Sequence, residues 1–150
     1  MFNYNDEDLV FKSDSLLRVH LNDEKVRKLI IAAKIKELKK NLNSDQYIEI
    51  LKLDPKNPIA LYTLHMRTGK LHHQKSFKNV QWDAIQSFYK AAAQIDTLWE
   101  PYYWIGKSYE KKDEMDFDSA LESYDKALEL SLADSTRKKI ETALMELTKK

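Results

Sequence analysis

The chain has 150 residues, the length of one ordinary domain, of which 43% are hydrophobic and 33% are charged. Its 25 Lys and Arg against 24 Asp and Glu leave a net charge of +1, which gives no global electrostatic argument for binding nucleic acid. The chain has no cysteine, so disulfides, thiolate zinc sites and cysteine nucleophiles are excluded, and we expect a reducing, cytoplasmic location.

Glycine and proline are scarce, with 2 Gly and 3 Pro, and this scarcity favours an all-α fold. Gly69 and Gly106 lie too far apart in the chain for a glycine-rich phosphate loop, and a sheet of this size would need many more turn residues. No apolar run approaches the roughly 18 residues that a membrane span requires, so no span is expected.

The hydrophobic periodicity predicts a series of helices in chain order. Residues 1–22 form a weakly helical N-terminal segment, and helices follow over residues 26–42, a short stretch ending at 53, then 57–68, 80–95, 99–111, 116–131 and 134–150. Pro55 and Pro58 end one helix and start the next, because proline is tolerated in a helix only in its first turn. Residues 67–79 are expected to be a long connection.

The two helices over residues 99–131 carry the clearest motif. The motif consists of apolar, small and aromatic positions on the first helix and an Ala-aromatic-Ala spacing on the second, namely Ile105, Gly106 and Tyr109, then Ala120, Tyr124 and Ala127. This pattern resembles a tetratricopeptide repeat, in which small residues let the paired helices approach closely and aromatic residues fill the gaps. Tyr102 stands where that family usually has tryptophan, and the turn at 110–119 is about two residues longer than in the family's repeat.

Two preceding segments resemble degenerate copies of the same repeat. Ala84, Phe88 and Ala91 show the second-helix spacing, with His65 at the usual glycine position, and residues 47–55 end in the Leu-Asp-Pro of a third copy. The resemblance implies one domain over residues 23–150, with approximate repeats at 24–55, 57–97 and 98–133 and a capping helix at 134–150. It also implies a right-handed solenoid, in which each helix pair covers the apolar face of its neighbour.

In such a solenoid the first helix of each pair lines a concave groove, and the resemblance places six residues there: Tyr62, Thr63, Met66, Tyr103, Trp104 and Lys107. Aromatic rings and a methionine suit the apolar side chains of a peptide or helix. The resemblance therefore implies a non-catalytic adaptor or scaffold that binds a peptide of a partner protein. If Trp104 faces an open groove, Trp104→Ala is expected to cost under about 1 kcal/mol of stability.

Two alternatives to an open groove remain within the same fold. In the first alternative, the chain's own N-terminal or C-terminal segment covers the groove. In the second, the chain is a dedicated chaperone of a secreted or assembling client. The carboxylate clamp with which some relatives bind heat-shock chaperones is not expected, because Glu100 and Trp104 replace cationic donors of that clamp.

Charge is unevenly distributed along the chain, and one stretch is purely basic. Residues 1–54 sum to a charge of 0, residues 55–82 to +5 and residues 83–150 to −4. Within the basic stretch, four cations form a candidate patch for an acidic partner, a phosphorylated segment or RNA: Arg67, Lys70, Lys75 and Lys78. The alternative is a soluble connecting loop without a ligand.

Patterns typical of catalysis or metal binding are weak. The four histidines form no His-Glu-x-x-His pair, and the adjacent His72 and His73 are expected to be solvated loop residues. The acidic run at 113–118 lacks the central glycine and the final glutamate of a calcium loop. We therefore expect no metal, no cofactor and no enzymatic activity.

Overall fold

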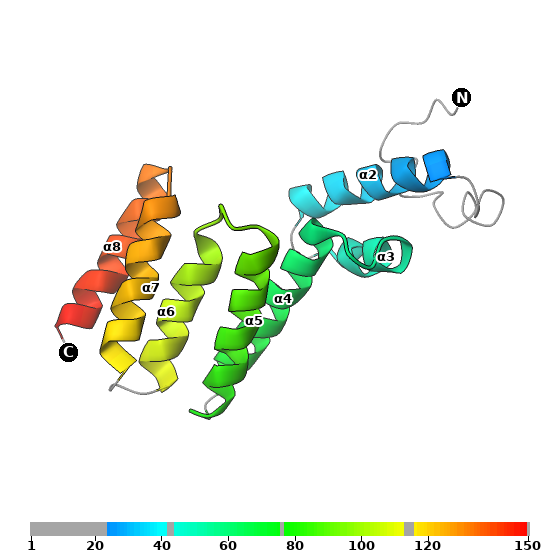
Figure 1. The fold of residues 1–150 in the computed structure, drawn as a ribbon. Helices are drawn as coiled ribbons and strands as arrows, with labels where there is room; N and C mark the ends of the chain where they lie inside the picture. The colour runs from blue at the N-terminus through cyan, green and yellow to red at the C-terminus, as the bar shows by residue number, and fades with distance from the viewer. Residues whose placement is uncertain (1–23, 42–43, 76, 113–115, 150) are drawn as a thin grey trace. The chain divides into compact units, whose positions relative to one another are not determined.

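The structure of the chain, a computed structural model, describes residues 24–41, 44–75, 77–112 and 116–149. These residues form an all-α fold, with no strand among them (Figure 1). The helices are α2 (Glu24–Lys40), α3 (Gln46–Leu53), α4 (Pro58–Gln74), α5 (Val80–Gln94), α6 (Glu100–Lys112), α7 (Phe117–Leu130) and α8 (Asp134–Thr148). The all-α prediction is confirmed, and five predicted helices agree with the observed bounds to within two residues at each end. The predicted N-terminal segment, residues 1–22, lies outside the described residues.

The chain groups into two compact units, Met1–Thr63 and Leu64–Lys150, where the sequence predicts one domain over residues 23–150. In the first unit, α2 packs against α3. Its core is formed by Leu38 of α2, Ile50 of α3 and Ala60 of the first turn of α4, all at most 1% exposed. The apolar stripe of α2 that contains Ile31, Ile35 and Leu38 therefore packs on α3 within this unit.

Helix α4 begins where the sequence predicts. The side-chain oxygen of Asn57 accepts a hydrogen bond from the backbone N–H of Ala60 at 3.1 Å, which satisfies one of the N–H groups that a helix start leaves unpaired. Pro58 is the first helical residue, where the missing N–H of proline costs nothing. These two residues are enough to place the start of the helix from local chemistry.

Helix α4 ends at Gln74, well beyond the predicted end at 68, so the expected connection over residues 67–79 is wrong for its first half. The cause is Gln81, a fully buried residue of α5. Its Nε2 donates to the backbone oxygens of His73 and Lys75, at 3.3 and 3.0 Å. The last carbonyls of a helix have no partner within it, and here the next helix supplies one.

Two helix pairs of the second unit pack by the same device, a glycine of the first helix against an aromatic ring of the second. A Cβ atom at Gly69 would lie 2.6 Å from Cε1 of Phe88, and a Cβ atom at Gly106 would lie 2.6 Å from Cε1 of Tyr124. The glycines are 37 positions apart and the rings 36 positions apart. Gly69, and not His65, therefore stands at the position equivalent to Gly106, and the predicted alignment of this pair is wrong by four residues.

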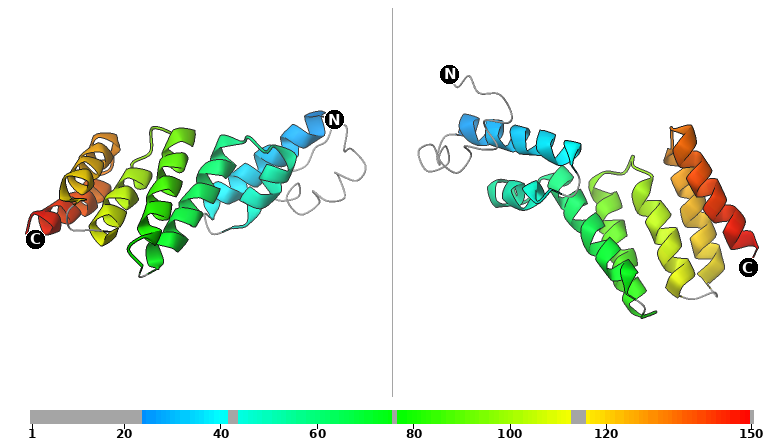
Figure 2. Two further views of the ribbon diagram at one scale, coloured as in Figure 1. Left: turned by 60° about the horizontal axis from the view of Figure 1, so that its bottom comes forward. Right: turned by 180° about the vertical axis from the view of Figure 1, so that it is seen from behind.

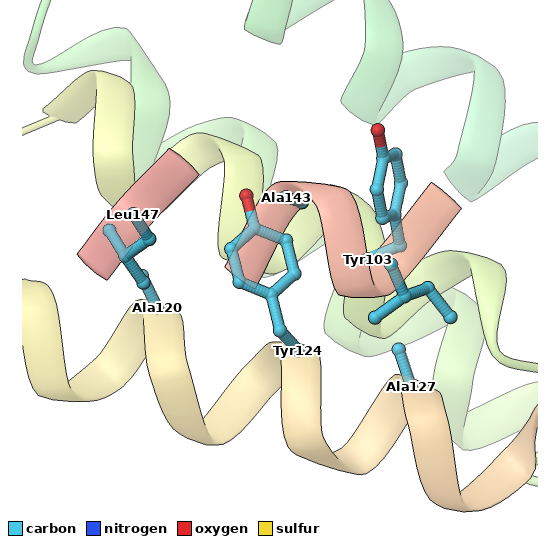
Figure 3. Packing of buried hydrophobic residues seen from close by; sticks show 7 residues of the cluster. Tyr103, Ala120, Tyr124, Ala127, Ala143 and Leu147 are labelled. Carbon is cyan, nitrogen blue, oxygen red and sulfur yellow. The ribbon is translucent and has the colours of Figure 1, made fainter. Parts of the chain in front are cut away.

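The last three helices share a core around Tyr124 (Figure 3). Tyr124 of α7 is fully buried, with Ala120 and Ala127 one turn away on either side and Ala143 of α8 opposite. Small side chains at these positions let neighbouring helices approach the ring closely. Tyr103 of α6 belongs to the same core.

Side chains of α4 and α8 both reach α6, so alternate helices of the second unit form one layer. Lys70 of α4 lies over a ring of α6, and Lys139 of α8 lies over another. Helices α5 to α8 run in alternating directions, each packed on the next (Figure 2). We call the surface of α4 (from Leu64), α6 and α8 face A, and the surface that α5 and α7 form beside α6 face B.

Candidate functional site

The structure does not gather all six predicted groove residues on one open surface. Tyr62 and Thr63 belong to the first unit, and Thr63 is buried with its hydroxyl donating to the backbone oxygen of Ile59 at 2.9 Å. Met66 belongs to the second unit and is 5% exposed. The shift in alignment set by Gly69 explains this placement, because the predicted positions lie one helical turn too early in α4.

Trp104 forms the centre of face A. Its indole stacks on Phe88 with 6.1 Å between the ring centroids, and the rings of His73 and Tyr103 meet it edge-on at 5.3 and 5.8 Å. These contacts hold the half-exposed indole in one orientation, so it offers a fixed apolar platform. Tyr103 is itself only 7% exposed and contributes mainly to the core beneath.

Three lysines from three helices surround this aromatic pair. The Nζ of Lys70 lies 5.4 Å from the ring centroid of Trp104, and those of Lys107 and Lys139 lie 5.7 and 5.0 Å from that of Tyr103. Attraction between an ammonium group and an aromatic face holds each lysine over its ring. None of the three forms an ion pair with a carboxylate of the described residues. Face A therefore combines an apolar platform with three lysine ammonium groups.

The structure divides the predicted basic patch into two parts. Arg67 and Lys70 are half-buried residues of α4, and Lys75 and Lys78 are exposed in the turn beyond its end. Lys70 directly follows one glycine of the packing device, as Lys107 follows the other. The sequence analysis predicts the groove and the basic patch as two separate sites. In the structure, Lys70 of the predicted patch lies over the ring of Trp104 of the predicted groove. Lys75 and Lys78 remain separate from this face.

A depression of about 230 Å³ lies beside the aromatic pair and is lined by His73, Lys107, Glu110 and Lys111. The carboxylate of Glu110 accepts a hydrogen bond from the buried hydroxyl of Tyr124, so this acid is engaged with the core. Burial and this carboxylate raise the pKa of Tyr124 well above its ordinary value, so the phenol stays neutral. The depression therefore carries the two ammonium groups of Lys107 and Lys111 against the one carboxylate of Glu110.

His73 contradicts the prediction of solvated loop histidines, because it lies in α4 together with His65 and His72. Its Nδ1 is 3.0 Å from the hydroxyl oxygen of Ser108 and 3.1 Å from the side-chain oxygen of Gln81. Burial lowers the pKa of His73, and the nearby ammonium group of Lys111 acts in the same direction. The imidazole is therefore neutral at neutral pH and joins α4, α5 and α6.

Lys139, Lys111 and His73 are functional candidates that sequence reasoning missed. The signal for Lys139 was present, since it stands on the polar side of α8 beside the apolar stripe that contains Ile140 and Ala143. The apolar spacing of α8 does not indicate which neighbouring helix its polar side contacts. The packing of α8 beside α6 supplies that information.

Within the described part of the chain, no group of three or more His, Cys, Asp or Glu side chains is arranged to hold a metal ion. None of the described helices combines the length and apolar character needed to cross a bilayer. Comparisons of the chain with protein-family models, with curated proteins and with solved structures found no match.

Proposed function

We propose that the second unit is a non-catalytic interaction module of the tetratricopeptide type that binds an acidic segment of a partner protein on face A. The observation that carries this proposal is the convergence of Lys70, Lys107 and Lys139 on the aromatic pair of Tyr103 and Trp104. These cations come from three helices far apart in sequence, and none of them forms an ion pair with a carboxylate of the described residues.

The repeated glycine–aromatic contact supports assignment to this type of repeat. Gly69 with Phe88 and Gly106 with Tyr124 give two helix pairs with almost the same internal spacing. In α8, Ala143 is a small buried residue that packs near the same tyrosine, as expected of a helix that caps the second pair. A solenoid of such pairs remains part of the proposal.

The geometry of face A fits a ligand that alternates apolar and acidic side chains. An apolar side chain of the ligand would rest on the indole of Trp104, where burial of both surfaces provides most of the affinity. Neighbouring carboxylates would reach the ammonium groups of Lys107 and Lys139 and form charge-assisted hydrogen bonds. Lys107 and Lys111 at the depression would bind a further carboxylate and thereby set the register of the ligand.

The chaperone and nucleic-acid hypotheses remain predictions without a specific supporting contact. A nucleic acid needs cations along its backbone track, whereas the structure separates Lys75 and Lys78 from the platform of Trp104 by the end of α4. For this reason the acidic peptide is the favoured ligand, and RNA enters as a comparison in the test.

The test is a titration followed by fluorescence polarisation with labelled 12-residue peptides. One peptide alternates Glu with Leu and Phe, and its control replaces every Glu by Gln. Wild-type chain is compared with Lys107→Ala and Lys139→Ala, and Lys138→Ala serves as the matched control, because Lys138 is an exposed lysine next to Lys139 on the same helix. A labelled oligouridine is titrated in parallel.

Binding of the acidic peptide, weakened about threefold or more by each of the two variants and left unchanged by Lys138→Ala, is the expected result. Equal binding of the Gln peptide would show that charge plays no part. Binding of oligouridine alone, or no binding of either peptide, would refute the proposed function.

A further inference from the structure

Face B carries a second pocket, about 210 Å³ in volume, which the proposed function does not use. It lies between α5, α6 and α7 and is lined by three tyrosines, two serines, a glutamate and a lysine, namely Tyr89, Tyr102, Tyr109, Ser119, Ser123, Glu122 and Lys126. Its volume exceeds the ~150 Å³ of a cavity that holds benzene. The pocket therefore has room for one small, compact group.

The three tyrosines come together from two helices. Tyr102 and Tyr109 are seven positions apart in α6 and thus lie on one side of it, and Tyr89 reaches them from α5. Tyr89 and Tyr109 thus line one pocket from two neighbouring helices. Burial is the main cause that raises the pKa of Tyr89 to about 12, and the neighbouring Tyr109, Tyr102 and Glu122 act in the same direction.

Glu122 is the charged group that the pocket leaves without a partner. Lys126 stands one helical turn further along α7, where an ion pair with Glu122 is common, but its Nζ lies 3.5 Å from the carboxylate of Glu129 instead. Glu122 forms no ion pair with any cation in the part of the chain that the structure describes. An unpaired carboxylate beside aromatic rings is complementary to a cation.

The aromatic wall next to this pocket already accommodates an ammonium group. Trp82 meets Tyr109 edge-on, with 6.2 Å between the centroids, and the Nζ of Lys112 lies 4.4 Å from the centroid of Trp82. The contact between Lys112 and Trp82 is of the same kind as the contact that a ligand cation would make with the tyrosine rings. Lys112 also pairs with Asp116, so it is held outside the pocket.

We propose that the pocket of Tyr89, Tyr102, Tyr109 and Glu122 binds a quaternary or N-methylated ammonium group. Aromatic rings attract such groups through their negative faces, and the bulky, weakly hydrated cation loses little by leaving water. Glu122 supplies the opposite charge at the rim. The chemistry is shared by choline compounds and by the trimethylated side chain of lysine, and the probes below separate these sources.

The experiment is NMR titration of the full chain, with the protons of the tyrosine rings as reporters. The probes are choline, phosphocholine, a short peptide with one trimethyl-lysine, and 3,3-dimethyl-1-butanol, the uncharged carbon analogue of choline. We expect dissociation constants for the cations on the order of 1 mM, with the uncharged analogue at least tenfold weaker. The tighter of phosphocholine and the peptide identifies the source.

Two variants separate the roles of charge and ring. Glu122→Gln changes only an exposed side chain and is expected to weaken choline binding about threefold to fivefold. Tyr89→Leu removes a ring that is 47% exposed and is expected to weaken it by a similar factor. Lys126→Ala, on the same rim, is the control and should not weaken choline binding.

Three results would overturn the proposal. They are equal binding of choline and its uncharged analogue, no shift of the tyrosine signals with any cation up to saturating concentration, and unchanged affinity in Glu122→Gln. Because Glu122 is exposed and in mid-helix, this variant remains informative even if a tyrosine variant fails to fold.

Discussion

Gly106→Ala tests the packing device on which the second unit depends. In most helix interiors this change is favourable, because alanine has the best helix propensity and glycine one of the poorest. Here the added Cβ would lie 2.6, 2.8 and 2.9 Å from three atoms of the Tyr124 ring, closer than carbon atoms can approach. The ring is fully buried and cannot turn away freely.

The two effects have opposite signs and comparable sizes. Replacing glycine by alanine in a helix interior gains about 1 kcal/mol, whereas one extra methyl group in a well-packed core costs about 1 to 3 kcal/mol. We therefore expect Gly106→Ala to lower the free energy of unfolding by about 1 kcal/mol. In a Tyr124→Leu background the clashing ring atoms are gone, so the same change should raise stability by about 1 kcal/mol.

The assay is urea denaturation of the four proteins of this double-mutant cycle, followed by tryptophan fluorescence. All three tryptophans, Trp82, Trp99 and Trp104, lie in the second unit, so the signal reports the unfolding of this unit. A coupling free energy of about 2 kcal/mol between the two positions is expected.

A stabilising effect of Gly106→Ala in the wild-type background would refute the reasoning, as would the same effect in both backgrounds. The pair of Gly69 and Phe88 offers an independent replicate with the same geometry, since a Cβ at Gly69 would also lie 2.6 Å from a ring atom. The two cycles should agree in sign.

Other variants test single contacts. Trp104→Ala is expected to cost about 2 kcal/mol in urea denaturation, more than an open groove would allow, because the indole packs on Phe88; a loss below about 0.5 kcal/mol would contradict this packing. Ala127→Glu should cost at least about 3 kcal/mol, because a charge enters a fully buried site, and normal thermal stability would show that the site is open. The pKa of the His73 imidazole is lowered in the folded chain, so neutral His73 stabilises the fold above its ordinary pKa of 6.5, and this stabilisation is lost as the pH falls below 6.5. The variant His73→Asn should therefore show a smaller decrease of the melting temperature on acidification. The raised pKa of Tyr89 acts in the opposite direction, with a contribution lost as the pH rises from about 10 towards 12, and Tyr89→Phe should reduce this alkaline loss.

Local signals in the sequence were sufficient for most of the helices. Apolar spacing and the turn around Pro58 depend on residues within a few positions of one another, and they predicted the all-α fold and five helices closely. The same spacing identified Ala120, Tyr124 and Ala127 as positions of one buried face, which the structure confirms.

Contacts between distant residues decided what the sequence left open. The end of α4 depends on a hydrogen bond from Gln81 of the next helix. Gly69 resembles a loop residue in the sequence, because the reason for a glycine there, the close approach of the Phe88 ring, is seen only in the folded chain. Periodicity shows which side of a helix is apolar but not which neighbour that side meets. Only the packing of α4 and α8 on either side of α6 could bring Lys70 and Lys139 to the rings of Trp104 and Tyr103, and so turn a predicted groove and a predicted basic patch into one face.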